Sequence, residues 1–254
     1  KYPVILPKHF AHTDEEPANV YAFIHAVSSS LREGQVTVVG NGSACVVGGH
    51  AYIIKKGQRF ITNSAIASMG YDLPAAIGAW TASRDKGCYS QGGDRSGEDL
   101  ILVTGDGSMQ MNLQELQTII HHRMGIKIFV INNGGYHSIR QTQKNFFGEP
   151  LIGIGVDSGD LSFPALDKLA AAYGYPYVSA RHNSELGKAV EKTLAAEGPA
   201  ICEVFVSMDQ NFEPKSSAKR LPDGTMVSPP LEDLSPFLPD EEMDENMIIP
   251  RIKG

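Results

Sequence analysis

The stretch LILVTGDGS, residues 100–108, decides the fold. Its first five residues are apolar or β-branched and predict a strand buried on both faces, and its glycine-rich end predicts a turn. Residues 108–123 then carry apolar side chains at helical spacing, and IKIFVINNGG, residues 126–135, repeats the pattern of a buried strand that ends in a polar turn. A strand–helix–strand unit of this kind predicts parallel strands that are covered by helices.

The same alternation continues on both sides of this unit. We expect helices at residues 20–32, 72–82, about 164–174 and 184–196, and further strands at 36–39, 177–179 and 200–206. The sequence therefore predicts an α/β domain over residues 20–208, built as a doubly wound parallel sheet with helices on both faces. Residues 1–19 contain three prolines and are expected to be a linker. The proline-rich, acidic segment 209–254 is expected to be an irregular C-terminal tail.

Composition excludes several classes of partner. The chain has 254 residues and a formal net charge of −7, and its Lys and Arg residues are scattered. We therefore expect no nucleic-acid partner and no anionic membrane surface. No apolar run is long enough to span a membrane. Three cysteines without a C-x-x-C pair favour reduced thiols and a cytoplasmic location.

The ends of the predicted strands carry the chemistry, because ligands of an open parallel sheet bind outside the C-terminal ends of its strands. Residues 105–108 lie at a helix start, where free N–H groups and the helix dipole favour a phosphate. The carboxylate of Asp106 would be repelled there unless a cation lay between the two. Mg²⁺ prefers about six oxygen ligands, and the amide oxygen of Asn133 and the carbonyl of Gly135 could complete such a set. Alone, Asp106 is more simply a turn residue, and the asparagine pair after the next strand favours the metal site.

These residues carry a family resemblance. Gly105-Asp106-Gly107-Ser108 followed by Asn132-Asn133 resembles the thiamin-diphosphate motif, and MNLQEL (111–116) and SMGYDLPAAIG (68–78) are similar to the acetolactate synthase large subunit. The resemblance covers about residues 20–206. It identifies the chain as the C-terminal, diphosphate-binding domain (the PP domain) of a thiamin-diphosphate-dependent enzyme.

The resemblance implies a set of site residues. Asp106, Asn133 and the main-chain oxygen of Gly135 should hold Mg²⁺. Met69 should have the catalytic task of holding thiamin diphosphate in its bent V shape, although a lone Met is more often core filler. The carbonyl of Ala67 should accept a hydrogen bond from the aminopyrimidine. The residues expected to contact the cofactor are Gly42, Ser43, Ala67, Met69, Gly105, Asp106, Gly107, Ser108, Asn133, Gly135, Tyr136, His137, Ser138 and Ile139.

The implied reaction is the decarboxylation of a 2-ketoacid, pyruvate first, followed by transfer of the acyl carbanion to an acceptor carbonyl. Decarboxylation without carboligation and a non-catalytic cofactor-binding subunit are the alternatives. Two departures from acetolactate synthases bear on the substrate. Thr142 stands where those enzymes have an acceptor-selecting Trp, so Thr142 is expected in the substrate pocket, and Ser43-Ala44 replaces a Gln-His pair.

The family also implies partners. Its catalytic glutamate belongs to a pyrimidine-binding domain of a neighbouring subunit, which we expect on another chain or on a part of this protein not included in these 254 residues. The family also allows a middle domain that binds FAD, and the sequence leaves open whether this protein has one. A homo-oligomer, either dimer or tetramer, is expected.

Other residues have simpler explanations. Arg140 could meet a substrate carboxylate or form a salt bridge. Gly40-Asn41-Gly42 lacks the third glycine and the acidic residue of a dinucleotide fingerprint, which we therefore reject. Glu115 is expected to be structural, and His121 and His122 to lie on the surface.

Overall fold

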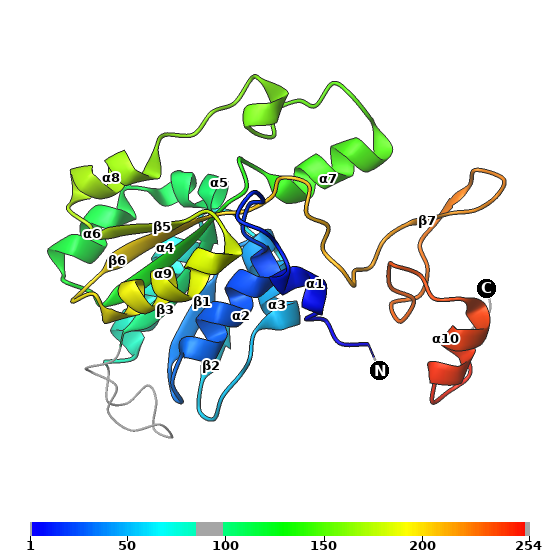
Figure 1. The fold of residues 1–254 in the computed structure, drawn as a ribbon, viewed down its shortest axis with the longest axis horizontal. Coiled ribbons are helices and arrows are strands. Elements are labelled where there is room, and N and C mark those ends of the chain that lie inside the picture. The colour runs from blue at the N-terminus through cyan, green and yellow to red at the C-terminus, as the bar shows by residue number, and fades with distance from the viewer. Residues whose placement is uncertain (1, 85–98, 252–254) are drawn as a thin grey trace. The chain divides into compact units, whose positions relative to one another are not determined.

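The computed structural model describes residues 2–84 and 99–251. Contacts divide the chain into two compact units, residues 5–210 and residues 1–4 with 211–254. The larger unit contains one sheet of six parallel strands in the order β2-β1-β3-β4-β6-β5 (Figure 1). The strands are β1 (Val36–Val39), β2 (Arg59–Ile61), β3 (Leu100–Gly105), β4 (Ile126–Asn132), β5 (Tyr177–Ala180) and β6 (Ala200–Phe205).

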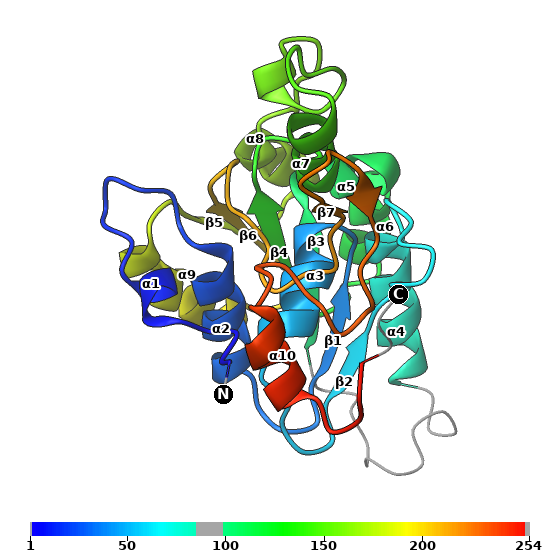
Figure 2. The same cartoon turned by 90° about the vertical axis from the view of Figure 1, so that its right-hand side faces the viewer.

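Helices cover both faces of this sheet, as predicted (Figures 1 and 2). The helices of the larger unit are α1 (Pro7–Phe10), α2 (Val20–Ser30), α3 (Ser43–Ala51), α4 (Asp72–Ala82), α5 (Asp106–Met109), α6 (Glu115–His121), α7 (His137–Phe146), α8 (Leu166–Tyr173) and α9 (Asn183–Ala195), with 3₁₀ turns η1 (Gln110–Asn112) and η2 (Val156–Ser158). On one face, Leu102 and Ile128 of the central strands pack against α4, α6 and α8. On the other face lie α2, α3 and α9, where Phe23 of α2 contacts Phe129 of β4. The fold is a doubly wound α/β sheet.

The order of the strands brings two polar turns together. β3 and β4 are neighbours in register, with Thr104 opposite Val130 and Gly105 opposite Ile131. The turn after β3 and the turn after β4 therefore emerge side by side at the C-terminal edge of the sheet. β1 lies on the other side of β3, and Gly40 after its end donates its N–H to the carbonyl of Val103 at 2.8 Å.

The region predicted as one helix over residues 108–123 is divided into α5, η1 and α6. Tertiary hydrogen bonds explain the interruption: Asn112 donates its side-chain amide to the carbonyl of Gly70 at 2.6 Å, and Ser108 accepts the N–H of Gly70 at 3.0 Å. Gly70 precedes Ser108 by 38 residues and Asn112 by 42 residues. These tertiary contacts override the local helical pattern. The sequence pattern also missed α3, α7 and β2, and α1 forms inside the segment expected to be a linker.

The smaller unit contains few regular elements. Its residues 211–251 form a hairpin of two-residue strands, β7 (Lys219–Arg220) and β8 (Met226–Val227), and one helix, α10 (Asp240–Asn246). Most of the remaining backbone is irregular, as expected for a segment with many prolines.

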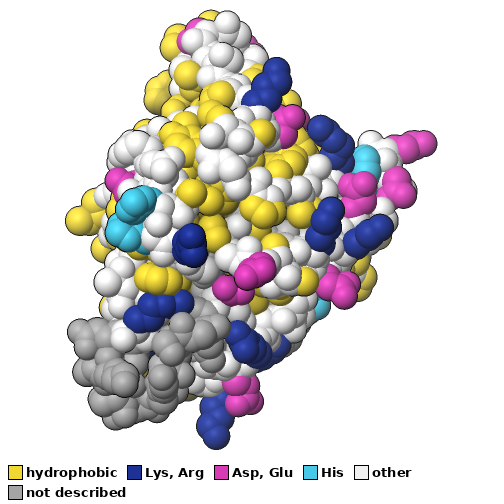
Figure 3. All heavy atoms as spheres, turned by 90° about the vertical axis from the view of Figure 1, so that its left-hand side faces the viewer, with side chains coloured by type: hydrophobic (Ala, Val, Ile, Leu, Met, Phe, Trp, Pro, Cys, Tyr) yellow, Lys and Arg dark blue, Asp and Glu magenta, His cyan; other side chains and the backbone are white. Residues whose placement is uncertain are grey.

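The surface and the thiols follow the composition. On the face in Figure 3, basic and acidic side chains are interspersed and do not separate by sign. None of the helices within residues 2–84 and 99–251 is both long and apolar enough to cross a bilayer. Cys45 and Cys202 are free thiols, and Cys88 lies outside the described residues.

Candidate functional site

The carboxylate of Asp106 joins the two polar turns. Asp106 is the first residue of α5 and its side chain is buried, with 7% of the residue exposed. Its Oδ1 accepts the N–H of Gly107 at 2.9 Å, and its Oδ2 accepts the N–H of Gly135 at 2.9 Å. One side chain therefore fixes the turn after β3 against the turn after β4.

Burial raises the pKa of Asp106 to about 7, although the N–H groups of Gly107 and Gly135 and the charge of Arg140 act in the opposite direction. Desolvation thus outweighs the groups that favour the charged form. A cation bound beside the carboxylate would reverse this balance, because a metal ion is the largest charge in its surroundings.

Asn133 supplies a second oxygen next to this carboxylate. Asn133 is 4% exposed, and its Nδ2 donates to the hydroxyl of Ser43 at 3.0 Å. Its Oδ1 is buried and has no hydrogen-bond partner among the described residues. A buried acceptor left unpaired costs about 1–3 kcal/mol, so this amide oxygen, in the same hollow as a buried carboxylate, fits a cation. Within the described residues no cluster of three or more His, Cys, Asp or Glu side chains could hold a metal ion. A cation here would therefore depend on amide, carbonyl and ligand oxygens, as Mg²⁺ does.

Two glycines in these turns are required by close packing. A Cβ on Gly107 would clash with the ring of Tyr136. Gly135 has φ +140°, and a Cβ there would clash with the carbonyl of Ile154. The turn after β4 is held in this close approach by Tyr136 N–H to Ile154 O at 2.7 Å and Val156 N–H to Gly134 O at 3.1 Å.

Three helices begin around the resulting hollow. α3 starts at Ser43, α5 at Asp106 and α7 at His137, and all three residues line the hollow. The first N–H groups of a helix have no partner within the helix and carry a partial positive charge, so three such starts favour an anion with several oxygens. The residues lining the hollow are Asn41, Gly42, Ser43, Met69, Gly105, Asp106, Gly107, Ser108, Asn133, Gly135, Tyr136, His137, Ser138 and Ile139.

The structure brings together all the expected cofactor-contacting residues except Ala67. Ala67 has φ +54°, an unusual value for a non-glycine residue, and it lies two residues before Met69. Met69 lines the hollow and is half-buried, so its side chain is not part of the hydrophobic core. The next residue, Gly70, is tied to Ser108 and Asn112, which holds Met69 against the helix start at Asp106.

Other candidates lie away from the hollow. Thr142 is exposed on α7, and its hydroxyl donates to the carbonyl of Ser138, a residue of the lining. Glu115 is half-buried in the first turn of α6 and is not among the lining residues. His121 and His122 are exposed, as predicted.

Arg140 forms the salt bridge that was one of its two interpretations. Its side chain is fully buried, and it pairs with Asp157 through two hydrogen bonds of 2.8 Å. Arg140 is absent from the lining of the hollow. Nothing in the local sequence indicates a pair that is 17 residues apart.

Two further residues escaped the sequence patterns. Asn41 lines the hollow, and its position in the Gly40–Gly42 turn was the available signal. Asp72 is fully buried at the start of α4, where its carboxylate accepts the hydroxyl of Thr104. A Cβ on Gly40 would lie 2.6 Å from Asp72 Oδ2, so this glycine allows the three segments to meet.

A second hollow lies at the same edge of the sheet, over β4, β5 and β6. It contains a buried acid, Glu203, with 4% of the residue exposed. Glu203 Oε1 accepts the amide N–H of Asn132 at 2.7 Å, and Oε2 accepts the hydroxyl of Tyr177. Burial and the adjacent Glu203 raise the pKa of Tyr177. Both oxygens of this acid are therefore occupied by donors of the chain itself.

Comparison with known proteins agrees with this geometry. Residues 40–204 match the family described as thiamine pyrophosphate enzyme, C-terminal TPP binding domain. The chain is similar to acetolactate synthase of Arthrospira platensis, with 31% identity over 157 residues, or 62% of this chain and 24% of the relative. It is also similar to the acetolactate synthase large subunit of Cyanidium caldarium, with 33% identity over 157 residues, or 61% and 24%. The chain thus spans about a quarter of the length of these relatives, since 24% of each is matched.

A solved structure has the same fold. The crystal structure of benzoylformate decarboxylase from Polynucleobacter necessarius superposes with a TM-score of 0.66 at 20% identity. The superposition covers 83% of this chain and 36% of the other.

Proposed function

The chain belongs to the thiamine pyrophosphate enzymes, as their C-terminal TPP-binding domain, and from this premise we propose that its hollow binds the diphosphate of thiamin diphosphate through Mg²⁺. One observation carries the proposal: the unpartnered, buried Oδ1 of Asn133 lies in the same hollow as the buried carboxylate of Asp106. Two such acceptors need a cation, and the three helix starts around them need an anion. A magnesium diphosphate supplies both.

Each part of the hollow has a task in this proposal. Asp106, Asn133 Oδ1 and the carbonyl of Gly135 would hold the metal. The helix starts at Ser43, Asp106 and His137 would bind the diphosphate oxygens. Met69 would support the cofactor in its bent shape, and Ala67 would present its carbonyl to the aminopyrimidine. Bound thiamin diphosphate supplies a nucleophilic carbon and stabilises the negative charge left when a 2-ketoacid loses CO₂.

The proposed reaction is decarboxylation of a 2-ketoacid, pyruvate first, with transfer of the two-carbon carbanion to an acceptor carbonyl. Its support is the similarity to acetolactate synthases. Thr142, one turn beyond Ser138 on α7, would line the acceptor pocket in the assembled enzyme. The second candidate is decarboxylation that ends in protonation. A non-catalytic cofactor-binding subunit is the remaining candidate, and it would release no CO₂ from pyruvate even with its partner domain present.

A partner domain completes the proposal. Among the described lining residues Asp106 is the sole acid, and the proposal assigns it to the metal. The glutamate that activates the pyrimidine ring would therefore come from a pyrimidine-binding domain, in a dimer or tetramer. A middle domain with FAD and a cytoplasmic location belong to the same proposal.

The test is product analysis on the natively purified holoenzyme. Native mass spectrometry first identifies thiamin diphosphate, Mg²⁺, FAD and partner chains. Incubation with pyruvate should then yield CO₂ together with acetolactate or another ligated product. Acetaldehyde as the sole organic product would favour the second candidate, and absence of bound thiamin diphosphate and of CO₂ release would overturn both.

A further inference from the structure

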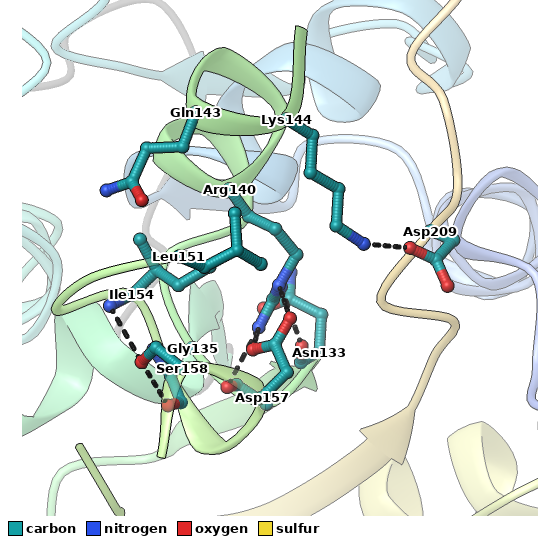
Figure 4. A network of polar contacts seen from close by, with 12 residues as sticks. Asn133, Gly135, Arg140, Gln143, Lys144, Leu151, Ile154, Asp157, Ser158 and Asp209 are labelled. Atoms are coloured by element: carbon teal, nitrogen blue, oxygen red, sulfur yellow. Dashed lines mark hydrogen bonds and ion pairs between the residues drawn. The ribbon is translucent and has the colours of Figure 1, made fainter. Parts of the chain in front are cut away.

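Arg140 is a fully buried cation whose side chain bonds the turn after β4 and the 3₁₀ turn η2 (Figure 4). Its Nε and Nη2 donate to the two carboxylate oxygens of Asp157 at 2.8 Å each. Its Nη1 donates to the carbonyl of Asn133 at 3.1 Å, and its Nη2 also donates to the carbonyl of Gly134 at 3.1 Å. Breaking a buried bidentate pair by removing one partner is costly, so this guanidinium has one stable position.

The two carbonyls that Arg140 binds belong to the turn that carries the proposed metal ligands. The Asn133–Gly134 peptide follows the side chain with the unpartnered Oδ1, and the Gly134–Gly135 peptide carries the N–H that binds Asp106. Gly134 and Gly135 have φ +69° and +140°. Glycines restrict the backbone little, so fixed peptide orientations here require external bonds. Arg140 supplies one bond to each of these two peptides.

Asp157 decides where the guanidinium lies. Asp157 belongs to η2, packed on the turn through Gly155, whose missing side chain leaves room for Arg140 Nη2. The hydrogen bonds from Arg140 keep the pKa of Asp157 below its usual value, so the pair is charged on both sides.

We propose that Arg140 and Asp157 are positioning residues for the divalent cation: Arg140 fixes the Asn133–Gly135 turn, and Asp157 fixes the guanidinium of Arg140. The inference rests on the proposed function. Its cation is Mg²⁺, and neither residue touches the metal or the substrate. Partners that orient metal ligands in this way typically change metal affinity by about 10–100-fold when they are replaced.

The test measures Mg²⁺ binding by calorimetry on the full holoenzyme stripped of metal, at saturating thiamin diphosphate, together with kcat as a function of Mg²⁺. Asp157→Asn keeps the size of the side chain, Arg140→Lys keeps the positive charge, and each change weakens the pair. Each should raise the Mg²⁺ concentration for half-saturation by about 10–100-fold. Excess Mg²⁺ should restore kcat to within about threefold, which a globally damaged protein would not do.

The matched control is Lys144→Met, on the same helix. Lys144 forms an ion pair of 2.6 Å with Asp209, but its side chain is 39% exposed and that of Asp209 is 74% exposed (Figure 4). Loss of an exposed pair should leave Mg²⁺ half-saturation unchanged.

A double variant guards against misfolding of the single ones. Arg140→Met with Asp157→Leu removes both charges and leaves neither unpaired, yet the two carbonyls still lose their bonds from Arg140. Its Mg²⁺ affinity should fall as in Asp157→Asn. The proposed positioning role would be wrong if the double variant, or Asp157→Asn, folded and bound Mg²⁺ as tightly as Lys144→Met. If Asp106→Asn in the same assay also leaves Mg²⁺ binding unchanged, the proposed function is wrong, and so is the positioning role that rests on it.

Discussion

Asp106 and Glu203 are two buried acids at the same edge of one sheet, and they have opposite surroundings. Glu203 receives donors from the side chains of Asn132 and Tyr177 on both oxygens. Asp106 receives backbone N–H groups, and the hollow that it lines contains a further acceptor, Asn133 Oδ1, which has no hydrogen-bond partner in the described part of the chain. Glu203 bonds two side-chain donors and needs no further ligand. Asp106 lies in the same hollow as the unpaired Asn133 Oδ1, and the two oxygens together could bind a cation.

Consecutive asparagines create this difference. Successive side chains at a strand end point to opposite sides. Asn132 turns towards Glu203 and also accepts the N–H of Gly134 at 3.0 Å, while Asn133 turns towards Ser43. Of the two asparagines in the motif, the second is therefore the candidate ligand and the first supports the turn.

The largest effect in this comparison is expected from Asp106→Asn. The variant keeps the size of the side chain and removes the sole anionic ligand proposed for Mg²⁺. We expect binding of Mg²⁺ and thiamin diphosphate to weaken by at least about 100-fold, since 2.7 kcal/mol or more of charge interaction is lost. Calorimetry on the stripped holoenzyme measures both.

Thermal unfolding of the same variant separates the site from the fold. Burial raises the pKa of Asp106, so the charged form costs free energy in the metal-free protein. Asp106→Asn removes that cost, but its amide N–H would face the N–H of Gly107 or Gly135, so metal-free stability should fall by no more than about 1–3 kcal/mol. The stabilisation that Mg²⁺ and thiamin diphosphate add to the wild type should disappear. Unchanged stabilisation by the cofactor would show that Asp106 is a turn residue only.

Much of this site could be predicted from the sequence, because its residues follow strand ends whose apolar patterns are strong. β1, α4 and the first strand residues of β3 and β4 begin where the patterns place them. The residues that support the site could not be predicted. Arg140 and Asp157, like Glu203 and Tyr177, meet through tertiary structure, and isolated charges in a sequence carry no sign of their partners. The interruption of the 108–123 helix has the same cause, since its bonds reach back to Gly70.

The next effect concerns the shape of the cofactor rather than its charge. Met69→Ala removes a half-buried side chain from the hollow and leaves the metal oxygens in place. We expect kcat to fall by about 10–100-fold, because a misplaced reacting group costs rate even when binding persists. Affinity for thiamin diphosphate should change by less than about fivefold in the calorimeter.

Stability is a necessary control for Met69→Ala. The half-exposed position implies a smaller loss than the 2–5 kcal/mol typical of core Met→Ala replacements. A variant with normal kcat would place Met69 among filler residues, and one with a large loss of stability would contradict its half-buried position.

Thr142→Trp tests the exposed end of the site on α7. Thr142 is one turn beyond Ser138, which lines the hollow. A Trp there would narrow the proposed acceptor pocket and shift the product ratio between a small and a large acceptor by about 10-fold, roughly the effect of a methylene-sized misfit. Competition between two acceptor ketoacids measures the ratio. Gln141→Ala, on a neighbouring position of the helix, is the control that should leave it unchanged, and an equal shift in both variants would remove Thr142 from the pocket.

The smallest effect on the cofactor is expected from Glu203→Gln, although this acid is as buried as Asp106. The Gln oxygen could still accept from Asn132 Nδ2, which is fixed by its bond from Gly134, and the Gln N–H would donate to the Tyr177 hydroxyl oxygen in a reversed bond. Two hydrogen bonds to a carboxylate become bonds to a neutral amide, so the free energy of unfolding should fall by about 1–3 kcal/mol. Mg²⁺ half-saturation should move by less than about threefold, because Glu203 does not line the hollow that contains Asn133, and its link to the metal turn passes through Asn132 alone. Denaturant unfolding and calorimetry on the same sample give the two numbers, with Tyr177→Phe as the variant that removes a donor and keeps the acid. A loss of about 100-fold in Mg²⁺ binding in Glu203→Gln would mean that Glu203 also supports the metal site. The proposed difference between Glu203 and Asp106 would then be wrong.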